Sequence, residues 1–148
     1  MLEKLKDFLS GSHASADDKG PSLDVAFTAL LVEAARIDDQ YDDSEKALID
    51  RIIADEFDLN AGEAADLRAR AEADQAQALD HYRYSSVVKQ ALDETQRAAF
   101  VERLWEVVLA DGKRDQYEDY LIRRLIGLIH VSDQESGAAR KRAEARRG

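Results

Sequence analysis

Eight carboxylates occur in this chain as two sets of four with the same internal spacing. The first set is Glu33, Asp38, Asp42 and Glu45, and the second is Glu106, Asp111, Asp115 and Glu118. Clustered carboxylate oxygens are hard ligands that suit Ca²⁺ or Mg²⁺, and paired carboxylates can also act as general acid and base. No further catalytic motif accompanies them, so we expect a non-enzymatic protein with a candidate cation site in each set.

The two sets lie in an internal repeat. Residues 31–53 align without a gap over residues 104–126, and nine of the 23 paired positions are identical. Unrelated segments of this length would share about one or two identities. The related regions extend over about 24–57 and 97–130, so any element that positions the first set should recur for the second.

Helical periodicity dominates the sequence, and no segment alternates with the period of a strand. The patterns predict helices over about 1–10, 22–37, 43–57, 61–74, 94–110 and 116–130, with further helices after Ser85 and Ser132. We therefore predict an all-α fold, a compact bundle of about seven helices. It should contain two related helix–turn–helix hairpins, packed face to face with pseudo-twofold symmetry.

Helix capping is a competing explanation for half of the acids. Asp42 and Asp115 are each followed three residues later by a Glu, just before an apolar helix. This is the spacing of a capping box, in which the first side chain accepts a backbone N–H of the helix and the Glu side chain reaches back. Asp42, Glu45, Asp115 and Glu118 can therefore be explained by helix starts alone.

The remaining acids have two interpretations. Glu33 and Glu106 border apolar stripes, and an Arg repeats with each, so ion pairs Glu33–Arg51 and Glu106–Arg124 are one expectation. The other is that all four acids of a set converge on a cation. The spacing is not that of an EF-hand, because position 12 of the loop, counted from Asp38, is Ile49 instead of Glu.

Composition narrows the class of protein. Cysteine is absent, which excludes disulfides and thiolate metal sites, and the three His lack metal-ligand spacing. No apolar run reaches the roughly 20 residues of a membrane span, and residues 1–9 do not resemble a signal peptide, so we expect a cytoplasmic protein. The aromatic residues Trp105, Tyr117 and Tyr120 fall beside apolar helix positions, so we expect them to pack in the core or at a hairpin interface instead of forming a ligand site. The rings of Tyr82 and Tyr84 should also be buried.

Charge divides the chain into two parts. Residues 134–148 carry a net charge of +3, from five Arg and Lys against two Glu. Because the whole chain carries −10, residues 1–133 carry −13. We therefore predict one domain over 1–133 and a basic C-terminal helix or tail over 134–148. The acidic body disfavours nucleic acid and suits cations or a basic partner. Oligomeric state is not readable from the sequence.

Two runs resemble a known family. Ala29–Arg36 and Leu104–Gly112, each followed by an acid and then by Glu before an apolar helix, resemble the tellurite-resistance TerB-like family over about 24–132. The resemblance implies an all-helical domain of about seven helices, related to the N-terminal domain of a membrane-anchored J-domain co-chaperone. It also implies a cation-binding role for the repeated acids, and links to chemical stress and membrane-associated protein complexes.

Two hypotheses follow from the sequence. In the first, the protein is a TerB-like stress-response module that binds Ca²⁺, Mg²⁺ or partner proteins through its acidic hairpin turns. In the second, it is a structural protein–protein interaction domain whose acids only cap helices and form ion pairs.

Overall fold

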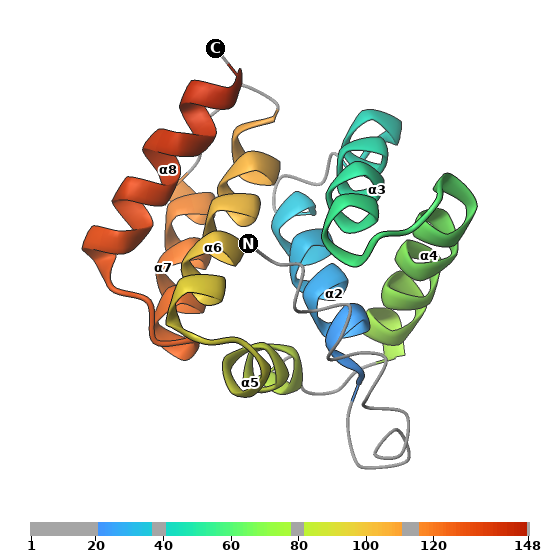
Figure 1. The fold of residues 1–148 in the computed structure, drawn as a ribbon, viewed down its shortest axis with the longest axis horizontal. Coiled ribbons are helices and arrows are strands. Elements are labelled where there is room, and N and C mark those ends of the chain that lie inside the picture. Colours follow the sequence, from blue (N-terminus) through green and yellow to red (C-terminus); the bar gives the residue numbers. More distant parts are fainter. Residues whose placement is uncertain (1–20, 37–40, 78–81, 111–115, 148) are drawn as a thin grey trace.

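Among the described residues, the chain forms a bundle in which five helices pack around a central one, and the last helix packs on the outside of this bundle (Figure 1). The computed structural model describes residues 21–36, 41–77, 82–110 and 116–147, with only the backbone for 116–119 and 147. Its elements are α2 (Leu23–Ala35), α3 (Asp43–Phe57), α4 (Ala61–Gln77), α5 (Tyr82–Ala91), α6 (Glu94–Leu109), α7 (Gln116–Leu128) and α8 (Asp133–Arg147). The predicted all-α fold is confirmed, and no strand occurs in these ranges. The helix predicted over 1–10 lies outside the described residues.

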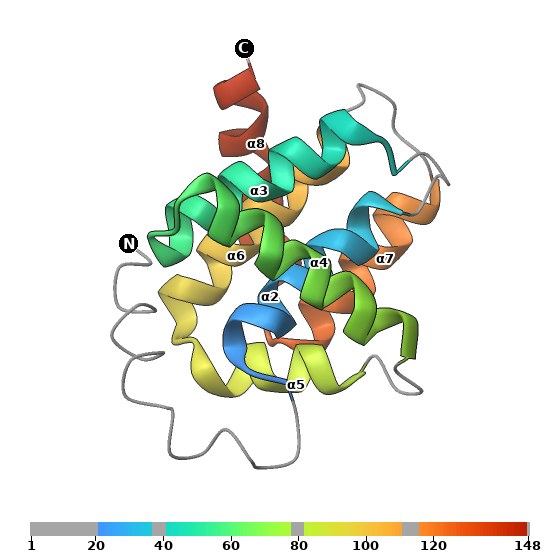
Figure 2. The ribbon, with the colours of Figure 1, turned by 90° about the vertical axis from the view of Figure 1, so that its right-hand side faces the viewer.

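Helix α2 is the centre of the bundle because its sequence is apolar on nearly every side. Ten of its 13 residues are buried, whereas a surface helix buries only one stripe. It packs against α3, α4, α5, α6 and α7. In Figure 2, α4 crosses in front of α2, on the side away from α6.

Aromatic packing joins the two halves of the chain. The ring of Phe27 on α2 lies 5.2 Å from that of Phe57 on α3 and 4.7 Å from that of Phe100 on α6, measured between centroids. All three rings are buried. Such pairs contribute roughly 0.5–1.5 kcal/mol beyond the burial of their surface. The core therefore includes side chains from both repeats.

Within the described residues, four helices begin with a capping box. The pairs are Asp42–Glu45 at α3, Asn60–Glu63 at α4, Asp93–Gln96 at α6 and Ser132–Glu135 at α8. Each pair satisfies backbone N–H groups that the first helical turn leaves without a partner. Capping boxes are thus common in this chain, and capping alone can explain an Asp and a Glu at this spacing.

The two predicted hairpins are α2–α3 and α6–α7. Helix α2 contacts α6, while α3 contacts α6 and α7 contacts α2. These contacts are reciprocal between the two hairpins, as a twofold relation requires. The pseudo-twofold symmetry itself, like the domain limit at residue 133, stays a prediction.

Two tyrosines differ from the sequence expectation. Tyr84 is buried, and its hydroxyl donates a hydrogen bond of 2.7 Å to Asp74, as a buried phenol requires. Tyr82 and Tyr120, however, are 56% and 68% exposed, so the prediction that they pack inside is wrong. Each lies on an amphipathic helix at a position that faces outward.

Candidate functional site

The first acid set contains a complete capping box. The Asp42 side chain accepts the backbone N–H of Glu45 at 3.0 Å, and the Glu45 side chain accepts the backbone N–H of Asp42 at 3.4 Å. A hydrogen bond from the Ser44 hydroxyl, followed by that from the Glu45 backbone, lowers the pKa of Asp42. The structural interpretation of these two acids is therefore confirmed at α3.

Tyr41 fixes the residue immediately before this cap. Its hydroxyl donates a hydrogen bond to Glu72 on α4, and its ring lies 5.1 Å from the cationic groups of both Arg36 and Lys46. Burial is the main cause that raises the pKa of this phenol. Glu72 also pairs with Arg68, which bonds Asp50 on α3 at 2.6 Å. The start of α3 is thus held against α4.

Of the other predicted ligands in the first set and of those in the second, only some lie among the described residues. Glu33 is partly buried on α2 and lines a small cavity of about 30 Å³ that includes Tyr82 and Arg124. Asp38, Asp111 and Asp115 lie outside the described residues, and so does the side chain of Glu118. Their convergence on a cation stays a prediction.

Glu106, the first acid of the second set, is engaged by two arginines. Arg103 Nη1 lies 3.1 Å from Glu106 Oε2, and Arg146 on α8 pairs with Glu106 Oε1. The Glu106 side chain is only 12% exposed, so these guanidinium groups compensate the charge that burial would otherwise penalise. The predicted Glu106–Arg124 ion pair is wrong, because the partners of Glu106 are Arg103 and Arg146.

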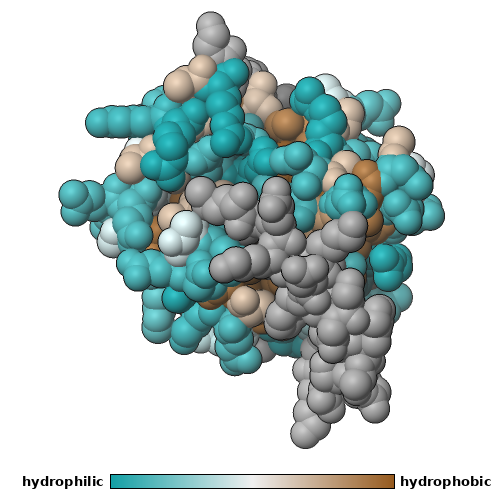
Figure 3. Space-filling view, viewed as in Figure 1, coloured by the Kyte–Doolittle hydropathy of each residue, from teal (hydrophilic) through white to brown (hydrophobic). Residues whose placement is uncertain are grey.

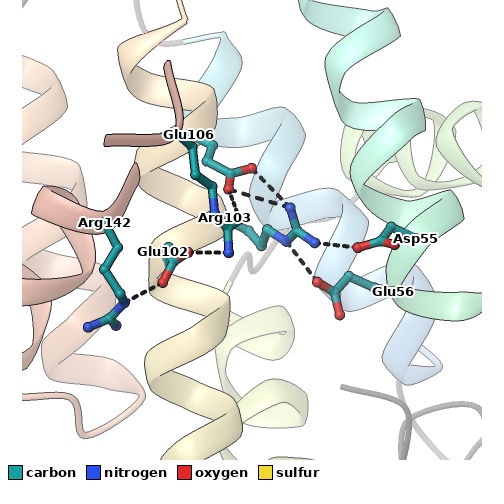
Figure 4. Close-up of polar contacts among 7 residues, drawn as sticks. Asp55, Glu56, Glu102, Arg103, Glu106 and Arg142 are labelled. Carbon is teal, nitrogen blue, oxygen red and sulfur yellow. Dashed lines mark hydrogen bonds and ion pairs between the residues drawn. The ribbon is translucent and has the colours of Figure 1, made fainter. Parts of the chain in front are cut away.

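Arg103 joins α6 to α3. Its Nε lies 2.7 Å from Glu56 Oε1 and its Nη2 lies 2.6 Å from Asp55 Oδ2, so one guanidinium serves three carboxylates with Glu106 (Figure 4). Burial raises the pKa of Glu56, against the opposing effect of Arg103. The planar fork of Arg is suited to this role, whereas Lys would present a single charged nitrogen.

Helix α8 continues the same network on the far side of α6. Arg142 Nε lies 2.6 Å from Glu102 Oε1, and Arg146 Nη2 lies 2.7 Å from Glu102 Oε2. The side chain of Glu102 is 8% exposed, while both arginines are more than half exposed. Beneath these pairs, Ala139 and Ala143 are fully buried. The basic C-terminal helix is therefore docked on the acidic face of α6.

A groove opens between α3, α6 and α8, beside this network. It has a volume of about 520 Å³, and its apolar lining comes from Leu48, Ile52, Ala110 and Ala143. Figure 3 shows hydrophobic surface there, between hydrophilic side chains near the top of the view. Arg51 lies in this groove with Glu106, and Arg124 lies in the small cavity with Glu33, so each repeated Arg shares a cavity with the Glu of the other copy.

The α3–α6–α8 network was not predicted from the sequence because its partners are far apart in the chain. One signal was present: Glu102 and Glu106 are four residues apart on one helix, and so are Arg142 and Arg146 on another. Residues at this spacing share a helix face, so the two pairs are complementary in both charge and position. No such local signal points from Arg103 to Asp55 and Glu56.

Neither a metal-binding cluster nor a membrane-spanning helix occurs among the described residues. Nowhere in the described ranges are three or more Asp, Glu or His side chains grouped so that they could hold a metal ion. Within the same ranges, every helix is too short or too polar to cross a membrane.

Comparison with known proteins gives one family. The family model described as "Tellurite resistance protein TerB" matches residues 24–141, which is most of the chain and includes the greater part of α8. Neither the curated proteins nor the solved structures contain a match. The relation to the J-domain co-chaperone stays an expectation. The family match agrees with the all-helical fold, and the chain belongs to the TerB tellurite-resistance family.

Proposed function

We propose that this chain is a non-enzymatic TerB module of the response to tellurite and related chemical stress, and that it acts by binding a protein partner. Its repeated acids hold helices together. The observation that carries this proposal is the use of the acids inside the fold. Asp42 and Glu45 cap α3, and Glu106 is neutralised by Arg103 and Arg146.

The absence of a catalytic role is part of the proposal. A general acid or base must lie within hydrogen-bond reach of its substrate. Glu56 is the described carboxyl with a raised pKa, and its side chain is 6% exposed and bonded to Arg103. Such a group supports the packing of α3 on α6, and it has little surface to offer a substrate.

Divalent-cation binding is the second candidate function, and one observation favours it. Asp42 Oδ1 accepts hydrogen bonds from the Ser44 hydroxyl and from the Glu45 backbone N–H, so this carboxylate is oriented at the start of α3. Asp42 is exposed and its lowered pKa keeps it ionised at neutral pH. A cation bound at this carboxylate would need further ligands, for which Asp38 is a candidate in the first set, as Asp111, Asp115 and Glu118 are in the second.

Calorimetric titration separates the two functions. For the full chain at neutral pH, we expect neither heat nor a shift in thermal unfolding up to millimolar Ca²⁺ or Mg²⁺. Asp111→Asn and Glu118→Gln test the second turn, and Asp42→Asn tests the first. A saturable heat that these substitutions abolish would overturn the structural role of the acids and establish the cation site.

A further inference from the structure

The groove between α3, α6 and α8 has the dimensions and direction of a seat for a helix. On α3 it is lined by Leu48, Arg51, Ile52 and Asp55, which follow the i, i+3, i+4, i+7 spacing of one helix face. This face extends along α3 for two turns, or about 10 Å. The volume of about 520 Å³ lies within the range of sites that bind ligands. A second helix can lay an apolar stripe into such a groove.

The charge that the groove offers to a partner is positive, although the whole chain carries −10. Both carboxylates in its lining are already paired: Asp55 with Arg103, and Glu106 with Arg103 and Arg146. Arg51 is exposed and makes no hydrogen bond or ion pair with any residue in the described ranges. The Arg146 side chain is 55% exposed. Two guanidinium groups therefore border an apolar floor.

We infer that the groove binds an amphipathic helix of a partner protein whose apolar stripe is flanked by Asp or Glu. The stripe would cover Leu48 and Ile52, and the flanking carboxylates would lie beside Arg51 and Arg146. This inference rests on the proposed function, an interaction module, and it adds the surface and the chemistry of the partner.

The amphipathic segment predicted at residues 1–10 is a poorer occupant. In a helical arrangement, its apolar stripe is flanked by Lys4 and Lys6, and it consists of Leu2, Leu5, Phe8 and Leu9. These ammonium groups would meet the guanidinium groups of the groove, and like charges brought together across an interface oppose binding. The charge pattern therefore favours an acidic partner over the chain's own first segment.

The test uses two synthetic helical peptides of about 14 residues, long enough to cover both turns of the groove. Both carry the same leucine stripe. One has Glu at the flanking positions and the other has Lys. Calorimetry with the full chain near 0.15 M salt, where screening limits repulsion from the distant body, should show about tenfold tighter binding of the Glu peptide.

Arg51→Glu is the decisive variant, because Arg51 is exposed and its loss breaks no described ion pair. It should reverse the preference between the two peptides by about tenfold in each direction. Arg70→Glu, an equal charge change at an exposed position of α4, should leave both affinities unchanged. Equal binding of both peptides, stronger binding of the Lys peptide, or no binding of either would overturn the inference.

One further variant tests the alternative occupant. If the Glu peptide binds only after Leu5→Asp and Phe8→Asp are introduced together into the full chain, the groove belongs to the N-terminal segment and the inference fails. These outcomes are independent of the metal titration, so the module can keep its proposed function even if this surface has a different partner.

Discussion

The carboxyl groups of Asp42 and Glu56 have pKa values shifted in opposite directions. Asp42 is exposed and stabilised in its ionised form by hydrogen bonds from Ser44 and the Glu45 backbone, which lower its pKa. Glu56 is buried, and burial raises its pKa. The first group favours the folded state when it is charged, and the second favours it when it is protonated. The same residue class thus has two different effects on stability.

The contribution of Asp42 should depend on pH in a defined direction. Its folded pKa lies below the ordinary value of 3.8, so its stabilising effect is complete above that pH and is lost as the pH falls through the folded pKa. Asp42→Asn should therefore be less stable than the natural chain at neutral pH, and the difference should shrink in acid. Urea unfolding at pH 7 and below pH 3.8 measures it. A constant difference would show that Asp42 acts without its charge.

How far the sequence predicts the site depends on the distance between partners. The Asp42–Glu45 box is local, so spacing alone identified it. The ion pair of Glu106 was misassigned to Arg124, because the repeat suggested a partner in the same copy. The actual partners are Arg103, one turn away, and Arg146, which is 40 residues distant. The pairing of Glu106 with Arg146 depends on where α8 packs in the fold. The residue pattern within one repeat does not indicate that position.

At the scale of elements, α8 docks with little apolar surface. Its fully buried apolar side chains are alanines, and four charged side chains border the contact with α6. The helix itself was predictable from the Ser132 cap and the absence of Pro after it. Its docking was not, since an alanine-rich, basic sequence of mean hydropathy well below zero has the composition of a solvated tail.

Gly137 offers a test of α8 as a helix. A Cβ added at this exposed position would contact nothing within 4 Å. Gly137→Ala should therefore stabilise the chain by about 0.5–1 kcal/mol, because Ala loses less backbone entropy than Gly in a helix. Urea unfolding measures the gain. Gly62→Ala, in the first turn of α4, serves as a comparison and should gain less. Destabilisation at position 137 would contradict an exposed, regular α8.

At the scale of the whole molecule, Arg103 is the junction between distant parts of the chain. It connects α6 to Asp55 and Glu56 on α3, and it shares Glu106 with Arg146 of α8. The all-α bundle followed from hydrophobic periodicity. The central position of α2 was not predicted, although its nearly uninterrupted apolar sequence is typical of a helix buried on all sides. The ion pairs of Arg103 were not predicted either, because hydrophobic periodicity does not indicate which charged residues pair with each other.

Removing this junction should destabilise the entire bundle. Arg103→Ala leaves Glu56 and Glu106, both largely buried, without their shared cation. Loss of one partner from a buried ion pair costs about 3–5 kcal/mol. Urea unfolding should show this loss, whereas Arg70→Ala on the exposed face of α4 should change stability by less than about 0.5 kcal/mol. A loss below 1 kcal/mol for Arg103→Ala would show that solvent replaces the guanidinium.

The seat of α8 on α6 also contains the chain's single tryptophan. Trp105 is 6% exposed, its indole N–H donates to the Ser136 hydroxyl at 3.0 Å, and the Arg140 guanidinium lies 5.4 Å from its ring. Both neighbours belong to α8. Intrinsic fluorescence of the unlabelled protein therefore reports on one event, the seating of the last helix: departure of α8 would hydrate the indole and shift its emission to the red. Trp105 fluorescence can thus show whether α8, which lines one side of the groove, is docked on α6.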